Sequence, residues 1–133
     1  MSVALRQPVR DRAGARCEYC RFHEEHVPLW PFHLEHIVAA QHGGAEALEN
    51  LAWSCQRCNL HKGTNLSGID PDSGSVVRLF HPRTDIWLEH FAVDDQGRIQ
   101  GLTPTGRATG WLLQMNSPER IAIRRLLLTS GRW

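Results

Sequence analysis

Hydrophobic positions in the first half of the chain follow the patterns of short strands and short helices. Pro8 and Gly14 mark the start and the end of a predicted helix. The pair Gly43-Gly44 predicts a loop between two apolar stretches. The predicted elements are a helix over 8–14, strands over 32–39 and 51–54, and a helix from about Gln56 to a stop at Gly63.

The second half combines turn signals with apolar stretches and ends in an amphipathic pattern. Ser117 and Pro118 are typical of a helix start. In the helix that follows, Ile123, Leu126 and Leu127 share one face, so we expect them in the core and the neighbouring arginines on other faces. The remaining predicted elements are a loop over 64–75, strands over 76–80, 86–93 and 98–102 in a small antiparallel β-meander, and a helix over about 105–115.

The composition is typical of a globular protein. The 133 residues include 41% hydrophobic and 22% charged residues, which fits a single domain over residues 1–133 and argues against disorder. No apolar stretch approaches the roughly 20 residues that a membrane-spanning helix needs. The first residues also lack the apolar stretch of a secretory signal. We therefore expect a cytoplasmic location with reduced cysteines and no membrane contact.

The net charge of +1 hides an uneven distribution. Residues 1–21 have a balance of +3, residues 22–58 of −4, and residues 98–133 of +5. Basic flanks around an acidic, histidine-rich middle suggest a polyanion at the flanks and a cation in the centre. Ordinary solvated surface charge is the alternative interpretation, since the imbalance is mild.

The four cysteines form two closely spaced pairs. Cys17 and Cys20 are separated from Cys55 and Cys58 by 34 residues. Each pair can present two sulfurs to one ion from a single turn of chain, and two pairs complete a tetrahedral Zn²⁺ site. Because the pattern uses every cysteine, four unrelated buried thiols are the weaker interpretation. The sequence thus predicts a structural zinc ion.

A second motif lies between and after the cysteine pairs. It resembles the HNH nuclease family, in the type that combines a zinc ribbon with a ββα-metal motif. The resemblance covers residues 17–62, about a third of the chain. It implies an α+β fold in which the four-cysteine zinc site holds a ββα-metal HNH core together. The β-meander and C-terminal helices over 76–133 follow this core. The residues that carry it are His33-Leu34-Glu35-His36-Ile37, Gly43-Gly44, Asn50-Leu51 and Cys58-Asn59-Leu60-His61-Lys62, in that order.

The resemblance implies a role for each matched residue. His36 takes the place of the general base and Glu35 that of the first metal ligand. Asn50 takes the place of a structural residue that fastens the loop by hydrogen bonds to the backbone. Asn59 takes the place of the last metal ligand, where the family name has a His. This H-N-N variant leaves the metal preference open between Mg²⁺ and Mn²⁺.

The chemistry of phosphodiester hydrolysis agrees with these residue types. An imidazole can accept a proton from water near neutral pH. Carboxylate and amide oxygens are hard ligands suited to Mg²⁺ or Mn²⁺, which polarise a phosphate. His33 lies two residues before Glu35, so both side chains point to the same face of a strand, and His33 is a further candidate ligand. Because adjacent strand residues point to opposite faces, we expect irregular backbone at Glu35 and His36.

Candidate contacts to nucleic acid come from the helix after the second cysteine pair and from both basic flanks. Lys62 lies three residues after Asn59 on the same helix face and is expected to touch phosphate. Arginines can bind the phosphate backbone without reading bases, so the contact should tolerate sequence changes. The other candidates are Arg57, Arg10, Arg12, Arg16, Arg124 and Arg125.

Together these patterns predict an HNH endonuclease that hydrolyses DNA, with structural zinc and a catalytic divalent ion on Glu35 and Asn59. RNA stays open as a substrate. A zinc-ribbon module that binds nucleic acid without cutting it is the alternative, and a structural zinc domain that binds another protein is a third interpretation. Glu35 beside His36 favours the enzyme, since a pure binding module needs no carboxylate beside a phosphate.

Overall fold

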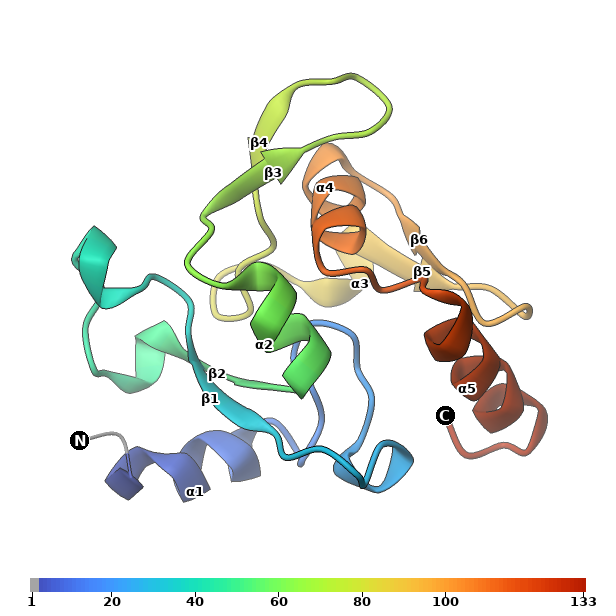
Figure 1. The fold of residues 1–133 in the computed structure, drawn as a ribbon, viewed down its shortest axis with the longest axis horizontal. Coiled ribbons are helices and arrows are strands. Elements are labelled where there is room, and N and C mark those ends of the chain that lie inside the picture. Colours follow the sequence, from blue (N-terminus) through green and yellow to red (C-terminus); the bar gives the residue numbers. More distant parts are fainter. Residues whose placement is uncertain (1–2) are drawn as a thin grey trace. The chain divides into compact units, whose positions relative to one another are not determined.

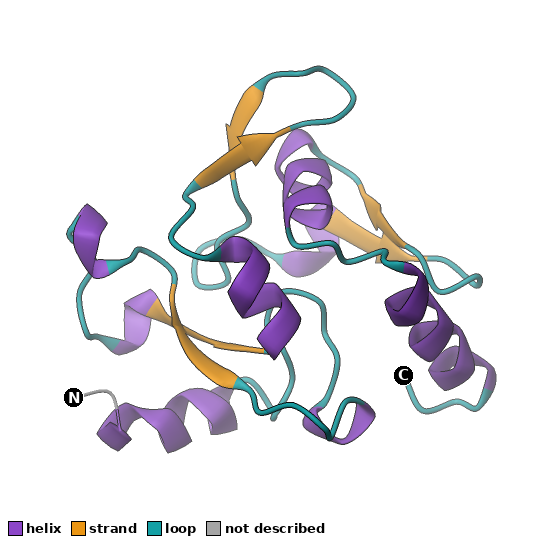
Figure 2. Ribbon diagram, viewed as in Figure 1, coloured by secondary structure: helices purple, strands orange, loops and turns teal. Residues whose placement is uncertain are grey.

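The structure is a computed structural model that describes residues 3–133 (Figure 1). It combines short helices with short antiparallel sheets (Figure 2). The chain divides into two compact units, and the single domain expected from its length stays a prediction. The first unit runs to Leu66 and also takes in His81–Thr84; the second consists of Ser67–Phe80 and Asp85–Trp133. The predicted zinc motif therefore falls within the first unit.

Helix α1 (Val3–Arg12) opens the first unit and begins earlier than the predicted helix over 8–14. Pro8 consequently lies inside the helix. The Ala, Leu, Arg and Gln residues before it are good helix formers, which explains the early start. Gly14 has a φ of +64°, and the N–H of Ala15 reaches the carbonyl of Arg10 at 3.1 Å. This left-handed ending is the stop that the glycine predicts.

Two antiparallel strands and a helix follow in the first unit. Strand β1 (His33–His36) pairs with β2 (Leu51–Ser54), and helix α2 (Gln56–Lys62) starts just after β2. The positions of β2 and α2 confirm the predicted elements, but β1 is shorter than the predicted strand over 32–39 because the chain then turns away from the sheet. The 3₁₀ turns of this unit are η1 (Glu24–His26), η2 (Ala40–His42) and η3 (Leu48–Asn50).

The core of the first unit draws on α1, β2 and the loop of the first cysteine pair. Val9, Phe22, Leu51 and Trp53 are almost completely buried. All four residues of β2 are buried, including the polar Ser54, so both faces of this strand are covered. The guanidinium of Arg6 lies over the Trp53 ring at 4.6 Å from the ring centroid, and so covers one side of this core.

Segment His81–Thr84 belongs to the first unit although both of its neighbours in sequence belong to the second. Arg83 donates a hydrogen bond to Glu18, and both side chains are mostly buried. The other carboxylate oxygen of Glu18 accepts the backbone N–H of Trp53 at 2.8 Å. Burial lowers the pKa of Arg83 to about 10. Because Glu18 lies within the first cysteine pair, Arg83 fastens the loop that carries that pair.

The second unit contains two β-hairpins in place of the predicted three-stranded meander. Strand β3 (Ser67–Ile69) pairs with β4 (Val76–Arg78), and β5 (Phe91–Val93) pairs with β6 (Ile99–Gly101). The meander prediction was wrong for two reasons. Part of the predicted loop over 64–75 forms β3, and helix α3 (Trp87–His90) interrupts the strand expected over 86–93.

Asp70 explains why the predicted loop closes into a hairpin. Its carboxylate accepts hydrogen bonds from the backbone of Asp72 and the hydroxyl of Ser73, each at 3.0 Å. Two nitrogens of Arg107 also reach it, both at 2.9 Å. The hydrogen bond from Arg107 holds the pKa of Asp70 well below its usual range. A residue typical of loops is thus the buried centre of a polar network.

Helices α4 (Pro104–Leu112) and α5 (Pro118–Thr129) complete the second unit. Ser117 and Pro118 start α5 as predicted. The buried face of α5 differs from the prediction, however. Leu127 is buried, but Leu126 is 68% exposed, while two arginines are buried. No helix within residues 3–133 has the length and apolar character needed to cross a membrane.

The buried arginines of α5 satisfy carbonyl groups where other segments end. Arg120 donates to the carbonyls of Leu113 and Gln114 at 3.0 and 3.2 Å. Arg124 donates to those of Gly97 and Met115 at 2.5 and 3.0 Å. Carbonyls at a helix end have no partner within the helix, so buried ones need donors from elsewhere. The hydrogen bonds from Arg120 and Arg124 to these carbonyls therefore decide which face of α5 is buried, and Leu126 lies at the surface.

Candidate functional site

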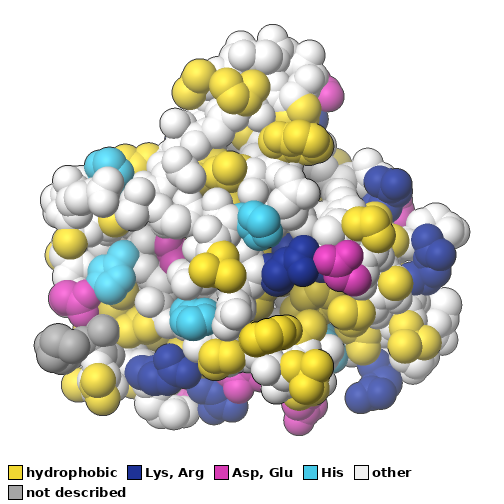
Figure 3. Space-filling view, viewed as in Figure 1, with side chains coloured by type: hydrophobic (Ala, Val, Ile, Leu, Met, Phe, Trp, Pro, Cys, Tyr) yellow, Lys and Arg dark blue, Asp and Glu magenta, His cyan; other side chains and the backbone are white. Residues whose placement is uncertain are grey.

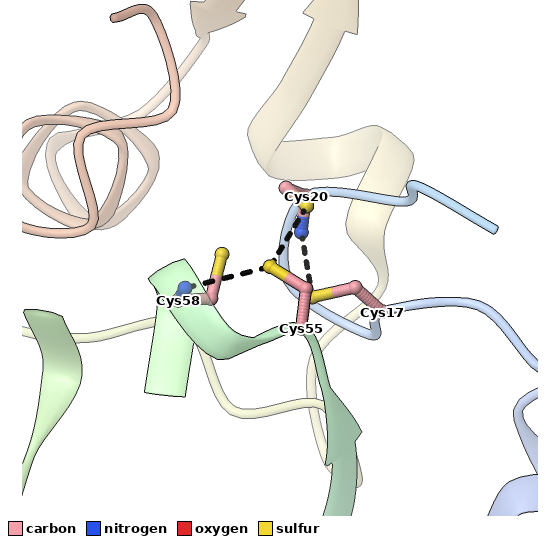
Figure 4. Close-up of side chains that lie close together, drawn as sticks. All are labelled: Cys17, Cys20, Cys55 and Cys58. Atoms are coloured by element: carbon pink, nitrogen blue, oxygen red, sulfur yellow. Dashed lines mark hydrogen bonds between the residues drawn. The ribbon is translucent and has the colours of Figure 1, made fainter. Parts of the chain in front are cut away.

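The sulfurs of both cysteine pairs converge on one point in the first unit (Figure 4). All four cysteines are buried and unbridged, and their Sγ atoms lie within 4.8 Å of one another. The Sγ atoms of Cys20 and Cys55 are 3.7 Å apart. Two sulfurs bound to one tetrahedral zinc ion lie about 3.8 Å apart, given Zn–S bonds of about 2.3 Å. The donor set and its spacing therefore fit Zn²⁺.

Backbone geometry presents each pair of sulfurs from a tight turn. The N–H of Cys20 donates to Cys17 Sγ, and that of Cys58 donates to Cys55 Sγ, both at 3.4 Å. Cys55 is also the N-cap of α2, so the second pair determines where that helix begins. After the first pair, Arg21 closes the turn with a φ of +71°.

Burial and mutual contacts disfavour ionisation of the Cys55 and Cys58 thiols, because both have a raised pKa. The hydrogen-bonding contact with Cys17 raises the pKa of the Cys55 thiol, and burial raises that of Cys58. Four buried sulfurs at this spacing cannot all ionise unless a positive charge lies among them. A metal ion bound by the four cysteines would supply that charge and hold the thiols deprotonated. Among residues 3–133, no other group of three or more His, Cys, Asp or Glu side chains is arranged to hold a metal.

Glu35 and His36 lie in a regular strand, so the expected irregular backbone was wrong. Glu35 pairs with Ala52 and His36 with Leu51 in an uninterrupted antiparallel register. Their side chains accordingly have different surroundings: Glu35 is 3% exposed, and the His36 side chain is 31% exposed. The two functional groups therefore do not share one open site.

The Glu35 carboxylate is held by two side chains from other segments. Its Oε1 accepts the hydroxyl of Tyr19 at 2.6 Å, and its Oε2 accepts Nζ of Lys62 at 2.8 Å. Lys62 also donates to the carbonyl of Ile37 at 3.0 Å, and only 1% of its side chain is exposed. Burial raises the pKa of Glu35, and the Lys62 ammonium opposes this effect. Tyr19 lies between Cys17 and Cys20, so this network joins the loop of the first cysteine pair to β1 and α2.

This network does not fit a divalent ion on Glu35. Both carboxylate oxygens already have donors, and the Lys62 ammonium supplies the positive charge that an ion would bring. Asn59, the other predicted ligand, is half-exposed on α2, three residues before Lys62. His33, the further candidate, has its Nε2 at 3.4 Å from the Gln56 side-chain oxygen.

Asn50 makes the hydrogen bonds predicted for it. Its Oδ1 accepts the N–H of Val38 at 2.9 Å, and its Nδ2 donates to the carbonyls of Val38 and Ala45 at 2.9 and 2.8 Å. The loop between β1 and β2 is thereby fastened across its base. Sequence reasoning missed Glu46 in this loop, whose Oε1 is in contact with Nε2 of His36. Its partner lies ten residues away, and nothing in the local pattern marked the pair.

The predicted nucleic-acid contacts have very different surroundings. Lys62 and Arg124 are buried, and both charges are used inside the fold, which argues against the phosphate contact predicted for them. Arg57 is exposed on α2. The remaining four also make internal hydrogen bonds: Arg10 to Glu24, Arg12 to the carbonyls of Leu48 and Leu51, Arg16 to that of Arg21, and Arg125 to that of Gln96.

Comparison with known proteins supports the first unit's resemblance. Residues 17–65 match the family model of the HNH endonuclease. This range includes both cysteine pairs, β1, β2 and α2. The clustered cysteines fit the zinc-ribbon type, so the family resemblance is confirmed for this segment. Neither the curated proteins nor the solved structures gave a match.

Proposed function

We propose that this protein is an endonuclease that hydrolyses phosphodiester bonds in DNA, with His36 as the general base. The match to the HNH endonuclease over residues 17–65 supports nuclease chemistry. The observation that carries the proposal is the accessible imidazole of His36 at the end of β1, with 31% of its side chain exposed. Several histidine side chains reach the surface on the face shown in Figure 3, but only His36 occupies the motif position of the base.

In the proposed reaction, His36 accepts one proton from a water molecule. The water oxygen forms a bond to phosphorus while the imidazole takes its proton, and the bond from phosphorus to the leaving sugar oxygen breaks. A proton from solvent then neutralises the leaving oxygen. General-base catalysis of this kind typically contributes about 10²–10⁴-fold to a rate.

Zinc has a structural role in this proposal. Cys17, Cys20, Cys55 and Cys58 would hold the ion, which supplies a fixed crosslink between the first loop and the start of α2. The strand that carries His36 packs beside these segments through β2 and the Glu35 network. A rigid support of this kind is what a catalytic side chain needs to keep its orientation.

A second candidate is a zinc-ribbon module that binds nucleic acid without cutting it. The cutting candidate expects Mg²⁺ or Mn²⁺ on Glu35 and Asn59, where the ion would act as a Lewis acid. The Lys62 ammonium bonded to Glu35 favours the non-cutting candidate, because it holds the carboxylate that such an ion would use.

A nicking assay on supercoiled plasmid tests both candidates. Zinc-loaded protein is incubated with Mg²⁺, with Mn²⁺ or without added metal, and a labelled RNA is tested in parallel. We expect cleavage of DNA by the unchanged protein and a loss of about 10²–10⁴-fold in His36→Ala, with zinc content and DNA affinity retained. His42→Ala is the matched control, since His42 is an exposed histidine of the loop that follows β1.

Cleavage by His36→Ala at the rate of the unchanged protein would show that the general-base assignment is wrong. If the unchanged protein binds DNA but leaves it intact under all three metal conditions, the non-cutting module is the correct candidate. Cleavage of RNA alone would move the proposed substrate from DNA to RNA.

A further inference from the structure

Glu46 contacts the proposed base, although no sequence motif marks it. Its Oε1 is in hydrogen-bond contact with Nε2 of His36, and the two groups form a charge pair when the imidazole is protonated. The side chains are 48% and 31% exposed, respectively. Glu46 lies in the loop between β1 and β2, ten residues after His36.

The backbone around Glu46 is anchored to the residues that follow His36. At Gly44 a Cβ would lie 1.7 Å from the carbonyl oxygen of Val38, so only glycine allows this approach of the two segments. Asn50 holds the same place by bonding both backbone groups of Val38 and the carbonyl of Ala45. The loop therefore places Glu46 next to the end of β1 by a fixed path.

An ionised carboxylate can only accept a hydrogen bond, so Nε2 of His36 must be the donor in this contact. In the neutral imidazole the proton then resides on Nε2, and Nδ1 carries the free lone pair. Carboxylates orient the imidazoles of metal-binding and catalytic histidines in the same way.

We propose that Glu46 is the positioning residue of His36: it fixes the ring and its tautomer, so that Nδ1 is the atom that accepts the proton of the attacking water. The catalytic part of this inference rests on the proposed function, whereas the tautomer can be measured without any substrate. A partly exposed ion pair contributes little to folding, so removal of Glu46 should leave the fold intact.

The first test is an NMR measurement of the imidazole nitrogens in the full, zinc-loaded chain. At about pH 8.5, above the usual titration range of imidazole, the ¹⁵N shifts report which nitrogen carries the proton. The His36 signals are identified by their loss in His36→Ala. We expect the Nε2-protonated form in the unchanged protein and in Glu46→Asp, and a mixture of tautomers in Glu46→Ala. Glu49→Ala, which removes an exposed carboxylate of the same loop, should resemble the unchanged protein.

The second test measures cleavage of a labelled DNA duplex by the same variants. Glu46→Ala should lower kcat by about 10–100-fold with KM, zinc content and Tm nearly unchanged, as expected when a group that orients a catalytic histidine is lost. Glu46→Asp should recover part of kcat. An unchanged His36 tautomer in Glu46→Ala would overturn the inference, and a shifted tautomer with full kcat would overturn its catalytic part. If the unchanged protein cuts nothing while the tautomer depends on Glu46, the proposed function has failed and the assigned orientation of His36 stands.

Discussion

Lys62 and Glu35 form a buried ion pair, so neither charge is directed at a ligand outside the fold. The pattern of the motif placed both at the surface of a catalytic site, one as a metal ligand and one as a phosphate contact. In the fold each is the other's principal partner, with 1% and 3% of the side chains exposed. Their hydrogen bonds to Tyr19 and to the end of β1 make them part of the first unit's support.

Replacement of Lys62 by methionine should strongly destabilise the first unit. The variant leaves the Glu35 carboxylate buried without its cation, and such a change typically costs about 3–5 kcal/mol. The free energy of unfolding is measured by urea titration of the zinc-loaded protein. The double variant Glu35→Gln/Lys62→Met should recover part of the loss, because the buried charge is then gone.

Arg57→Met provides the matched control on the exposed face of the same helix and should change stability by less than about 0.5 kcal/mol. If Lys62→Met unfolds at the same urea concentration as this control, the buried pair does not exist in solution.

A zinc ion on the four cysteines would link the loop of the first pair to the start of α2. Cys58→Ser should release the metal and unfold the first unit, because the free energy of zinc binding is then part of the free energy of folding. Zinc content and thermal unfolding are measured together, and Ser54→Ala serves as a control close to the second cysteine pair. A Cys58→Ser protein that keeps its zinc and its Tm would contradict the four-cysteine site.

The hairpin of β3 and β4 depends on pH through Asp70. Because the folded pKa of Asp70 is lowered, mainly by Arg107, the ionised carboxylate stabilises the fold at pH values above the usual range of Asp, about 4. This contribution is lost progressively as the pH falls below that value. Asp70→Asn should therefore lose stability at neutral pH, and its difference from the unchanged protein should shrink in acid.

Urea titrations at several pH values between about 7 and 3 measure this difference. Asp95→Asn, at an exposed turn of the same unit, is the control. A difference between Asp70→Asn and the unchanged protein that stays constant down to the lowest pH would argue against the lowered pKa.

Local signals predicted the start of α5 better than its buried face. Ser117 and Pro118 act on their own helix turn, so the start of α5 follows from neighbouring residues alone. The burial of Arg120 and Arg124 depends instead on carbonyls at Gly97 and 113–115, which only folding brings together. The same holds for the site: the cysteine spacing predicted the cluster of four sulfurs, but the partners of Glu35 and His36 come from distant positions.

The charge of the whole molecule differs from the charge available to a partner. Several arginines counted in the basic flanks bond to carbonyls or carboxylates inside the fold, and Arg124 is 0% exposed. Arg57 is exposed at the surface of α2, where a polyanion can reach it. An estimate that counts every arginine of the flanks as surface charge would therefore be too high for the attraction to nucleic acid.

DNA affinity should fall steeply with salt, because each phosphate contact releases counterions. Arg57→Ala should lower the slope of log K against log salt concentration by about 1 if Arg57 makes one such contact. Arg125→Ala on α5 is measured alongside it, since that guanidinium bonds to the carbonyl of Gln96 and should contribute less. Affinity that is the same at low and at moderate salt would exclude an electrostatic contact.

Residues 81–84 belong to the first unit, so the coding sequence of that unit extends beyond the recognised motif. The match to the nuclease family ends at residue 65, and a gene fragment that ends there would carry every recognised motif. It would lack Arg83, the partner of Glu18 beside the cysteines. The chain passes between the units at residues 66–67, 80–81 and 84–85. Recombination at the edge of the recognised motif would thus break a contact within the first unit, which favours inheritance of both units as one block.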